Sequence, residues 1–305
     1  MLLYKLLNSE TKRYKPHKSR NSMEGKLGRY DPEYAKKTLR RLERIGAEKI
    51  FFKDLIVTGR EKLTENKGRQ RIYIANHLSH MDYGTLWLDF HRHGIPMPMI
   101  PAGANLDKEI LKRIGLDLGK LSAYFIDRDL MKKNSQSATQ HKKDAINATR
   151  EIIANGLDFL VFPEGGRNEN ENDILNKYDT GALRAALHEK KDLDIVPVAF
   201  AYNHRVEEKF LPIIRKGNRK TILGKILYYG ADAFAYSIAR PFAKNILRLD
   251  VGNAYMSIGQ PTKLSKITSI LKFTKAKRVE AVKNFSTEKV KELYNSIQRK
   301  ENSYL

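Results

Sequence analysis

A histidine and an aspartate, His77 and Asp82, stand five positions apart directly after a short apolar segment. An imidazole that is held through one ring nitrogen by a carboxylate can accept a proton with the other, as a general base does. On a continuous helix, residues five apart point about 140° away from each other. The two side chains can therefore meet only if His77 lies in a turn and Asp82 in the first helical turns.

The apolar segment before this pair, residues 71–75, predicts a buried strand. A turn at the carboxyl end of a strand is where open α/β sheets place their chemistry. Metal binding by His77, His80 and Asp82 is an alternative, but it needs both histidines on one helix face. The chain has no cysteine and no H-E-x-x-H pattern, so no metal site is expected.

Predicted strands and helices alternate along most of the chain. Strands are expected at 71–75, 96–101, 122–126, 157–162, 195–201, 221–229 and 254–258, and helices at 32–46, 82–93, 107–114, 138–155, 181–189 and 277–300. This order predicts an α/β fold with a mixed, largely parallel sheet flanked by helices. In the helix at 138–155, the apolar face is expected to hold Ala145, Ile146, Thr149, Ile152 and Ile153, and Thr180 is expected to cap the helix at 181–189.

Composition narrows the class of protein. The 305 residues are 41% hydrophobic and include no cysteine, which excludes disulfides, thiolate catalysis and cysteine-ligated zinc. No apolar run approaches 18 residues, so no transmembrane helix is expected, and the first seven residues are too short and too soon polar for a secretory signal. A soluble or peripheral protein is the prediction.

The net charge of +22 is concentrated in the two ends of the chain. Residues 1–70 carry +10 and residues 205–305 carry +13, whereas residues 71–204 carry −1. Cationic flanks attract anionic lipid, nucleic acid or acidic proteins, or they are simply solvated. We expect residues 1–30 to be a poorly ordered basic arm and residues 31–305 to be one domain with its motif core at 71–204.

Two arginines also follow predicted strands. Arg128 comes just after the strand at 122–126, and Arg167 ends the turn 162–167, in which Gly165 and Gly166 allow a ligand to approach the backbone. Glu164 of that turn is expected to hold the arginine or to contact a substrate hydroxyl. The alternatives are an ordinary tight turn and, for Arg128, an ion pair with a neighbouring aspartate.

Four segments in this order resemble the motifs of the glycerophospholipid acyltransferase family. They are NHLSHMD from residue 76, YFIDR from residue 124, FPEGGR from residue 162 and IVPVAFAY from residue 195. The resemblance covers about residues 55–215, with a weaker match at 257–261. Four blocks in order are far more specific than a histidine–aspartate spacing alone.

Further details resemble the branch that contains glycerol-3-phosphate and dihydroxyacetone-phosphate acyltransferases. They are the run from His77 to Tyr83, the segment 102–106, the second glycine Gly166 and the tripeptide at 202–204. One departure is the polar, acidic run at 168–172, where that branch usually has serine, arginine and threonine. The chain is also far shorter than the large members of the branch.

The resemblance implies transfer of a fatty acyl group from acyl-CoA or acyl-carrier protein to the sn-1 hydroxyl of glycerol 3-phosphate, with no cofactor and no metal. It implies His77 as the base and Asp82 as its orienting group. The phosphate would be held by Arg128 and Arg167, in a pocket shaped by Glu164, Gly165 and Gly166. The basic flanks would then dock a peripheral enzyme on an anionic membrane at its cytoplasmic side.

Two alternatives remain at this point. The acceptor could be 1-acylglycerol 3-phosphate or dihydroxyacetone phosphate. In a different class, the chain would be a non-catalytic basic protein that binds a membrane or nucleic acid. The complete motifs argue against that class, because a non-catalytic protein has no chemical reason to keep both His77 and Asp82, and we expect no nucleic-acid partner.

Overall fold

The computed structural model describes residues 30–44, 46, 48–49, 52–64, 68–79, 81–107, 112, 116–168, 173–188, 193–204, 252–268 and 274–302. Nearly all of the predicted basic arm, the whole predicted strand at 221–229 and most of the predicted helix at 107–114 lie outside these residues.

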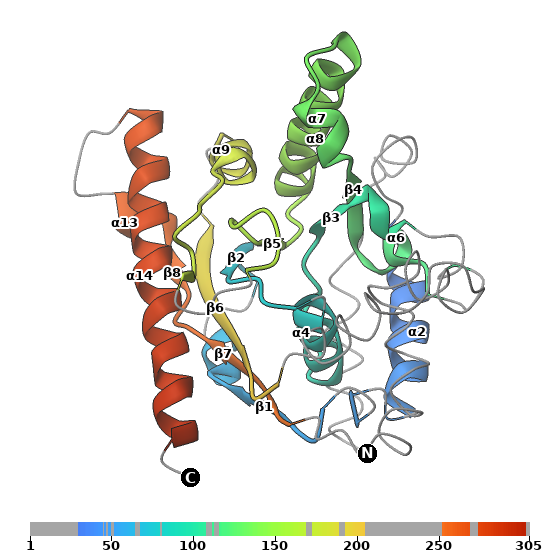
Figure 1. Cartoon of the computed structure of the whole chain (residues 1–305), viewed down its shortest axis with the longest axis vertical. Coiled ribbons are helices and arrows are strands. Elements are labelled where there is room, and N and C mark those ends of the chain that lie inside the picture. Colours follow the sequence, from blue (N-terminus) through green and yellow to red (C-terminus); the bar gives the residue numbers. More distant parts are fainter. Residues whose placement is uncertain are drawn as a thin grey trace, which may run out of the picture.

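A mixed sheet forms the centre of the described part of the chain (Figure 1). Its strands lie in the order β1 (Leu55–Thr58), β7 (Ala254–Ile258), β6 (Asp194–Tyr202), β2 (Arg71–Ala75) and β5 (Phe159–Val161), and β8 (Thr262–Lys263) pairs with the start of β6. Strand β2 is parallel to both β5 and β6, and β1 is parallel to β7. Only β7 and β8 run antiparallel to β6 among the described pairs, so the predicted largely parallel sheet is confirmed.

Two further strands form a separate small sheet. β3 (Ile100–Gly103) and β4 (Ala123–Ile126) pair in parallel. Met99 joins them to the main sheet, because its amide donates to Asp158 O and its carbonyl accepts from Leu160 N. Strand β4, which leads to Arg128, therefore lies beside the main sheet and not within it.

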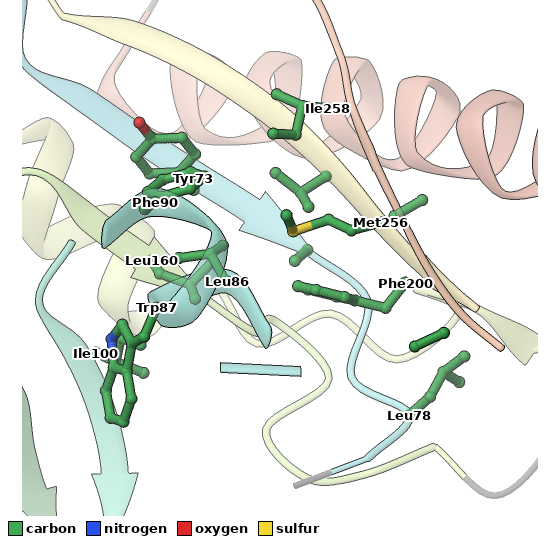
Figure 2. Packing of buried hydrophobic residues seen from close by; sticks show 14 of the residues in the cluster. Tyr73, Leu78, Leu86, Trp87, Phe90, Ile100, Leu160, Phe200, Met256 and Ile258 are labelled. Carbon is green, nitrogen blue, oxygen red and sulfur yellow. The ribbon is translucent and has the colours of Figure 1, made fainter. Parts of the chain in front are cut away.

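Helices cover both faces of the main sheet. In β2, Tyr73 and Ala75 pack in one cluster with α4 (Met81–Arg92), whereas Ile72 and Ile74 pack in another with α8 (Gln136–Ala154) and α9 (Gly181–Leu187). Because successive strand residues point to opposite faces, β2 is buried on both sides. Figure 2 shows α4 on one side of the strands and α14 (Lys275–Asn302) on the other.

The remaining described helices lie at the periphery. They are α2 (Pro32–Arg44), η2 (Arg60–Leu63), η3 (Ala104–Leu106), α6 (Leu118–Leu121), α7 (Arg128–Lys132) and α13 (Leu264–Thr268). None of the helices in the described ranges has the length and apolarity that crossing a bilayer requires.

Two details of the predicted helices were wrong. Ile146 is 39% exposed on α8, because it lies about 100° around the helix from the buried Ala145. Thr180 holds the N-cap position of α9, but its side chain does not make the expected capping hydrogen bond. Asp179 provides that bond instead, since its Oδ1 accepts from Gly181 N at 2.7 Å.

Candidate active site

The first, third and fourth motifs meet at one edge of the main sheet. Strands β2, β5 and β6 are parallel neighbours, so their carboxyl ends lie at the same edge. His77 follows β2, the turn 163–167 follows β5, and Tyr202 is the last residue of β6. Residues 85 to 124 positions apart in the sequence are thereby brought into contact.

His77 and Asp82 touch through their side chains. His77 Nδ1 lies 2.8 Å from Asp82 Oδ2. Residues 76–79 are not helical and α4 begins at Met81, which meets the condition that the five-residue spacing imposed. His77 is 8% exposed and Asp82 is fully buried. An imidazole held in this way through Nδ1 can direct Nε2 at a substrate.

Asp82 also organises the backbone around the pair. Its Oδ2 accepts hydrogen bonds from Leu78 N at 2.8 Å and from Ser79 N at 3.1 Å, and its Oδ1 accepts one from the Tyr202 hydroxyl at 2.5 Å. A buried carboxylate is costly unless hydrogen bonds replace its hydration. These donors replace the water that the Asp82 carboxylate loses on burial.

Two more side chains fix the segment that carries His77. Asn76 Nδ2 donates to Phe200 O and Asn76 Oδ1 accepts from Phe200 N, so this amide continues the pairing of β2 with β6 beyond the end of β2. The ring of Phe162 stacks on the His77 imidazole, with centroids 4.4 Å apart. The imidazole is therefore held at its edge by Asp82 and on its face by Phe162.

Glu164 binds the main chain of the first motif. Its Oε2 accepts from His77 N at 2.6 Å, and its Oε1 accepts from Leu175 N at 2.9 Å and from Asn168 Nδ2 at 3.0 Å. Leu175 has a left-handed φ of 55°, a conformation that the bond to Glu164 helps to hold. Two of these three contacts are thus with backbone amides of the site, a role that the sequence interpretation did not include.

Arg128 reaches the glycine turn from the small sheet. Its Nη1 donates to Gly165 O, and a Cβ at Gly166 would lie 4.0 Å from the same nitrogen. The neighbouring aspartates are used elsewhere, because Asp127 caps α7 through Leu130 N and Asp129 pairs with Lys132. Arg128, the first residue of α7, therefore contacts the turn 163–167 although the strand before it belongs to the small sheet.

Charge and backbone shape also distinguish this turn. Partial burial lowers the pKa of the Arg128 guanidinium, and the charge of Asp179 opposes that effect. An arginine stays protonated in either case. Gly165 has a φ of +69°, which a side chain would disfavour. Arg167 follows two residues later and is half-buried. Both arginines are thus attached to one glycine turn beside His77.

Sequence reasoning missed the contacts made by Asn76, Phe162, Asn168 and Tyr202. Asn168 begins the unusual polar run, and its backbone N–H donates to His77 O at 2.6 Å. In the sequence, Tyr202 stands out only as a feature that resembles one branch of the family. Its place directly after the predicted strand at 195–201 is the available signal, because the end of that strand lies beside the end of β2. His80, a candidate ligand in the metal alternative, lies outside the described residues, and no metal-binding cluster is found within them.

Comparison with known proteins agrees with the resemblance of the motifs. The family profile described as Acyltransferase matches residues 54–201. A glycerol-3-phosphate acyltransferase of Pseudoalteromonas atlantica is 27% identical over 205 residues, which cover 65% of this chain and 22% of that protein. One of Baumannia cicadellinicola is 33% identical over 156 residues, covering 48% of this chain and 17% of that protein. The match thus spans about a fifth of the length of these relatives.

Among solved structures, the 1-acyl-sn-glycerophosphate (LPA) acyltransferase from Thermotoga maritima matches 86% of this chain and 83% of its own chain. The TM-score is 0.46 and the sequence identity is 21%.

Proposed function

We propose that this chain, whose residues 54–201 match the Acyltransferase profile, transfers a fatty acyl group from a thioester to the sn-1 hydroxyl of glycerol 3-phosphate. The donor would be acyl-CoA or acyl-carrier protein, and no cofactor is required. One observation carries the proposal: a buried histidine–carboxylate contact of 2.8 Å lies beside a glycine turn that two arginines share. The relatives named glycerol-3-phosphate acyltransferase favour this acceptor.

In the proposed reaction, His77 Nε2 removes the proton from the acceptor hydroxyl. The hydroxyl oxygen attacks the thioester carbonyl, a carbon–oxygen bond forms, the carbon–sulfur bond breaks, and the proton passes from the imidazolium to the leaving sulfur. Asp82 holds Nδ1 and stabilises the imidazolium. The acyl group passes directly to the acceptor, without an acyl-enzyme intermediate.

The phosphate of the acceptor would bind between Arg128 and Arg167. Guanidinium groups form paired hydrogen bonds to phosphate oxygens, and the glycine turn lets the phosphate approach the backbone. Glu164, Gly165 and Gly166 shape this pocket, with Glu164 acting through the His77 amide. Holding the acceptor near His77 replaces a bimolecular encounter by a positioned one.

The reaction is tested by thiol release from palmitoyl-CoA, with and without glycerol 3-phosphate. His77→Ala should lower the acceptor-dependent rate by about 10²- to 10⁴-fold, the usual contribution of a general base. His93→Ala is the matched control, because His93 lies just past α4 and contacts Asp89. Equal rates in wild type and His77→Ala would refute the role of His77.

The acceptor is tested in the same assay. Release that requires 1-acylglycerol 3-phosphate or dihydroxyacetone phosphate, and does not occur with glycerol 3-phosphate, would replace the proposed acceptor but keep the reaction. Absence of release with every acceptor and with both kinds of donor would contradict the enzyme proposal. Duplex DNA binding in a filter assay across salt concentrations would then support the non-catalytic class.

The same proposal places the enzyme peripherally on the cytoplasmic side of a membrane. Helix α2 exposes Lys37, Arg40, Arg41 and Arg44, and each basic residue near an anionic surface contributes roughly 1 kcal/mol. Arg40→Glu combined with Arg41→Glu should weaken binding to phosphatidylserine vesicles by about 30-fold or more. Binding that is independent of salt and unchanged in this variant would refute electrostatic docking through α2.

A further inference from the structure

Tyr202 contacts the candidate catalytic pair from the opposite side to His77. Its hydroxyl donates to Asp82 Oδ1 at 2.5 Å, whereas His77 and two backbone amides use Oδ2. Within the described part of the chain, the hydrogen-bond donor to Asp82 Oδ1 is the Tyr202 hydroxyl. The two carboxylate oxygens are therefore held by different parts of the fold.

The sheet holds the Tyr202 side chain firmly. Tyr202 is the last residue of β6, where its Cα pairs with Ala254 of β7. Its ring stacks on the buried Phe52, with centroids 5.7 Å apart. Tyr202 itself is 5% exposed. A hydroxyl placed by a sheet and a stacked ring has little freedom to move, so it can fix the orientation of the group that it binds.

We propose that Tyr202 is a positioning residue for acyl transfer. Its hydroxyl fixes the plane of the Asp82 carboxylate and takes up part of the negative charge of that group. Without the hydroxyl, the carboxylate is held through Oδ2 alone, and only the three donors to that oxygen still oppose rotation about the Cβ–Cγ bond. The Nδ1 contact then loses its fixed direction, and with it the aim of Nε2 at the acceptor. This inference rests on the proposed function, since its main readout is the rate of that reaction.

Removal of the hydroxyl also changes the charge that faces the imidazole. A carboxylate that loses a donor keeps more negative charge on its oxygens, which stabilises a protonated imidazole beside it. The titratable groups that contact this unit include Tyr202 itself from β6 and Glu164, which binds the His77 amide from the turn after β5. The acidic limb of the rate profile should therefore move to higher pH in Tyr202→Phe.

Tyr202→Phe tests the proposal, with Tyr124→Phe as the matched control. Tyr124 is fully buried and also loses a hydrogen bond in its phenylalanine variant, a bond between two neutral hydroxyls to Thr149 at 3.0 Å, away from the pair. We expect Tyr202→Phe to lower kcat by about 10- to 100-fold with little change in KM, because a hydrogen bond to a charged group is lost. Tyr124→Phe should keep the wild-type kcat and pH profile.

Wild-type kcat and an unshifted pH profile in folded Tyr202→Phe would overturn the proposal. A loss of the same size in Tyr124→Phe would also overturn it, since a general effect on the fold would then explain both. If the wild type itself shows no acceptor-dependent release, the proposed function fails separately. Tyr202 is then tested by NMR of ring-labelled histidine, where the titration midpoint of His77 must move to higher pH in Tyr202→Phe and must not move in Tyr124→Phe.

Discussion

Replacement of Glu164 by glutamine separates two possible roles of this carboxylate. All three groups bound to it are donors: His77 N, Leu175 N and Asn168 Nδ2. Glutamine has the same shape, but its amide nitrogen must face a donor in either orientation. One N–H loses its acceptor if the new amide nitrogen faces His77 N, and two do if it faces Leu175 N and Asn168 Nδ2. The remaining bonds lose the charge of the carboxylate.

The expected cost follows from these contacts. Leaving one buried donor unsatisfied costs about 1–3 kcal/mol, and hydrogen bonds to charged groups contribute about 1.5–3 kcal/mol each. Because part of each bond survives in the variant, we expect Glu164→Gln to lower the free energy of unfolding by about 2–4 kcal/mol. The His77 backbone loses its anchor, so kcat should fall as well.

Urea unfolding at neutral pH measures the loss of stability, and the thiol-release assay measures kcat and KM. Glu43→Gln is the control, because Glu43 forms a half-exposed ion pair with Arg92, and its loss should cost about 0.5 kcal/mol or less. A Glu164→Gln protein with wild-type stability and a raised KM for the acceptor would refute this reasoning. Glu164 would then bind the substrate, as the sequence interpretation expected.

Three further results are expected from measurements of stability. Burial raises the pKa of Asp158 from 3.8 to about 7, so the unfolded chain releases this proton at lower pH and the folded state loses stability as pH rises from about 4 to about 7. Between pH 4 and pH 7, the free energy of unfolding of Asp158→Asn should rise by up to roughly 4 kcal/mol relative to that of the wild type. A difference between the two proteins that does not change with pH would contradict the raised pKa of Asp158. Gly59→Ala should abolish folding, because φ is +81° and the new Cβ would lie 2.0 Å from the last carbonyl oxygen of β7. Gly68→Ala, with φ +89° and open space, should cost only about 1–2 kcal/mol, and equal losses would refute the steric argument. Gly165→Ala, with φ +69°, should lower the free energy of unfolding by a similar amount, about 1–2 kcal/mol. Gly166→Ala should leave it nearly unchanged, since the new Cβ would lie 4.0 Å from Arg128 Nη1.

The elements around the site were predictable because their signals are local. The apolar run 71–75 and the start of α4 can be read from residue types within a few positions. The His77–Asp82 contact then follows from the change from extended chain to helix between them. The grouping of three strand ends followed from the expectation of a parallel sheet.

The partners of the pair could not be predicted in the same way. The contact between Tyr202 and Asp82 depends on which strands are neighbours, and the order β6–β2–β5 is a property of the whole sheet. Glu164 was assigned to a substrate or an arginine because a carboxylate in a turn gives no sign that it will bind a backbone amide. One of its donors, His77 N, lies 87 positions away.

The spacing of His77 and Asp82 serves the fold as well as the proposed chemistry. Asp82 Oδ2 accepts from Leu78 N and Ser79 N in addition to the imidazole, so this one oxygen closes the turn that precedes α4. A substitution of Asp82 therefore disturbs the turn and the imidazole together, and a loss of activity in such a variant cannot be assigned to either. His77→Ala leaves both backbone bonds to Asp82 in place, because they involve other residues. For this reason the histidine, and not the aspartate, is the position at which catalysis can be tested separately from folding.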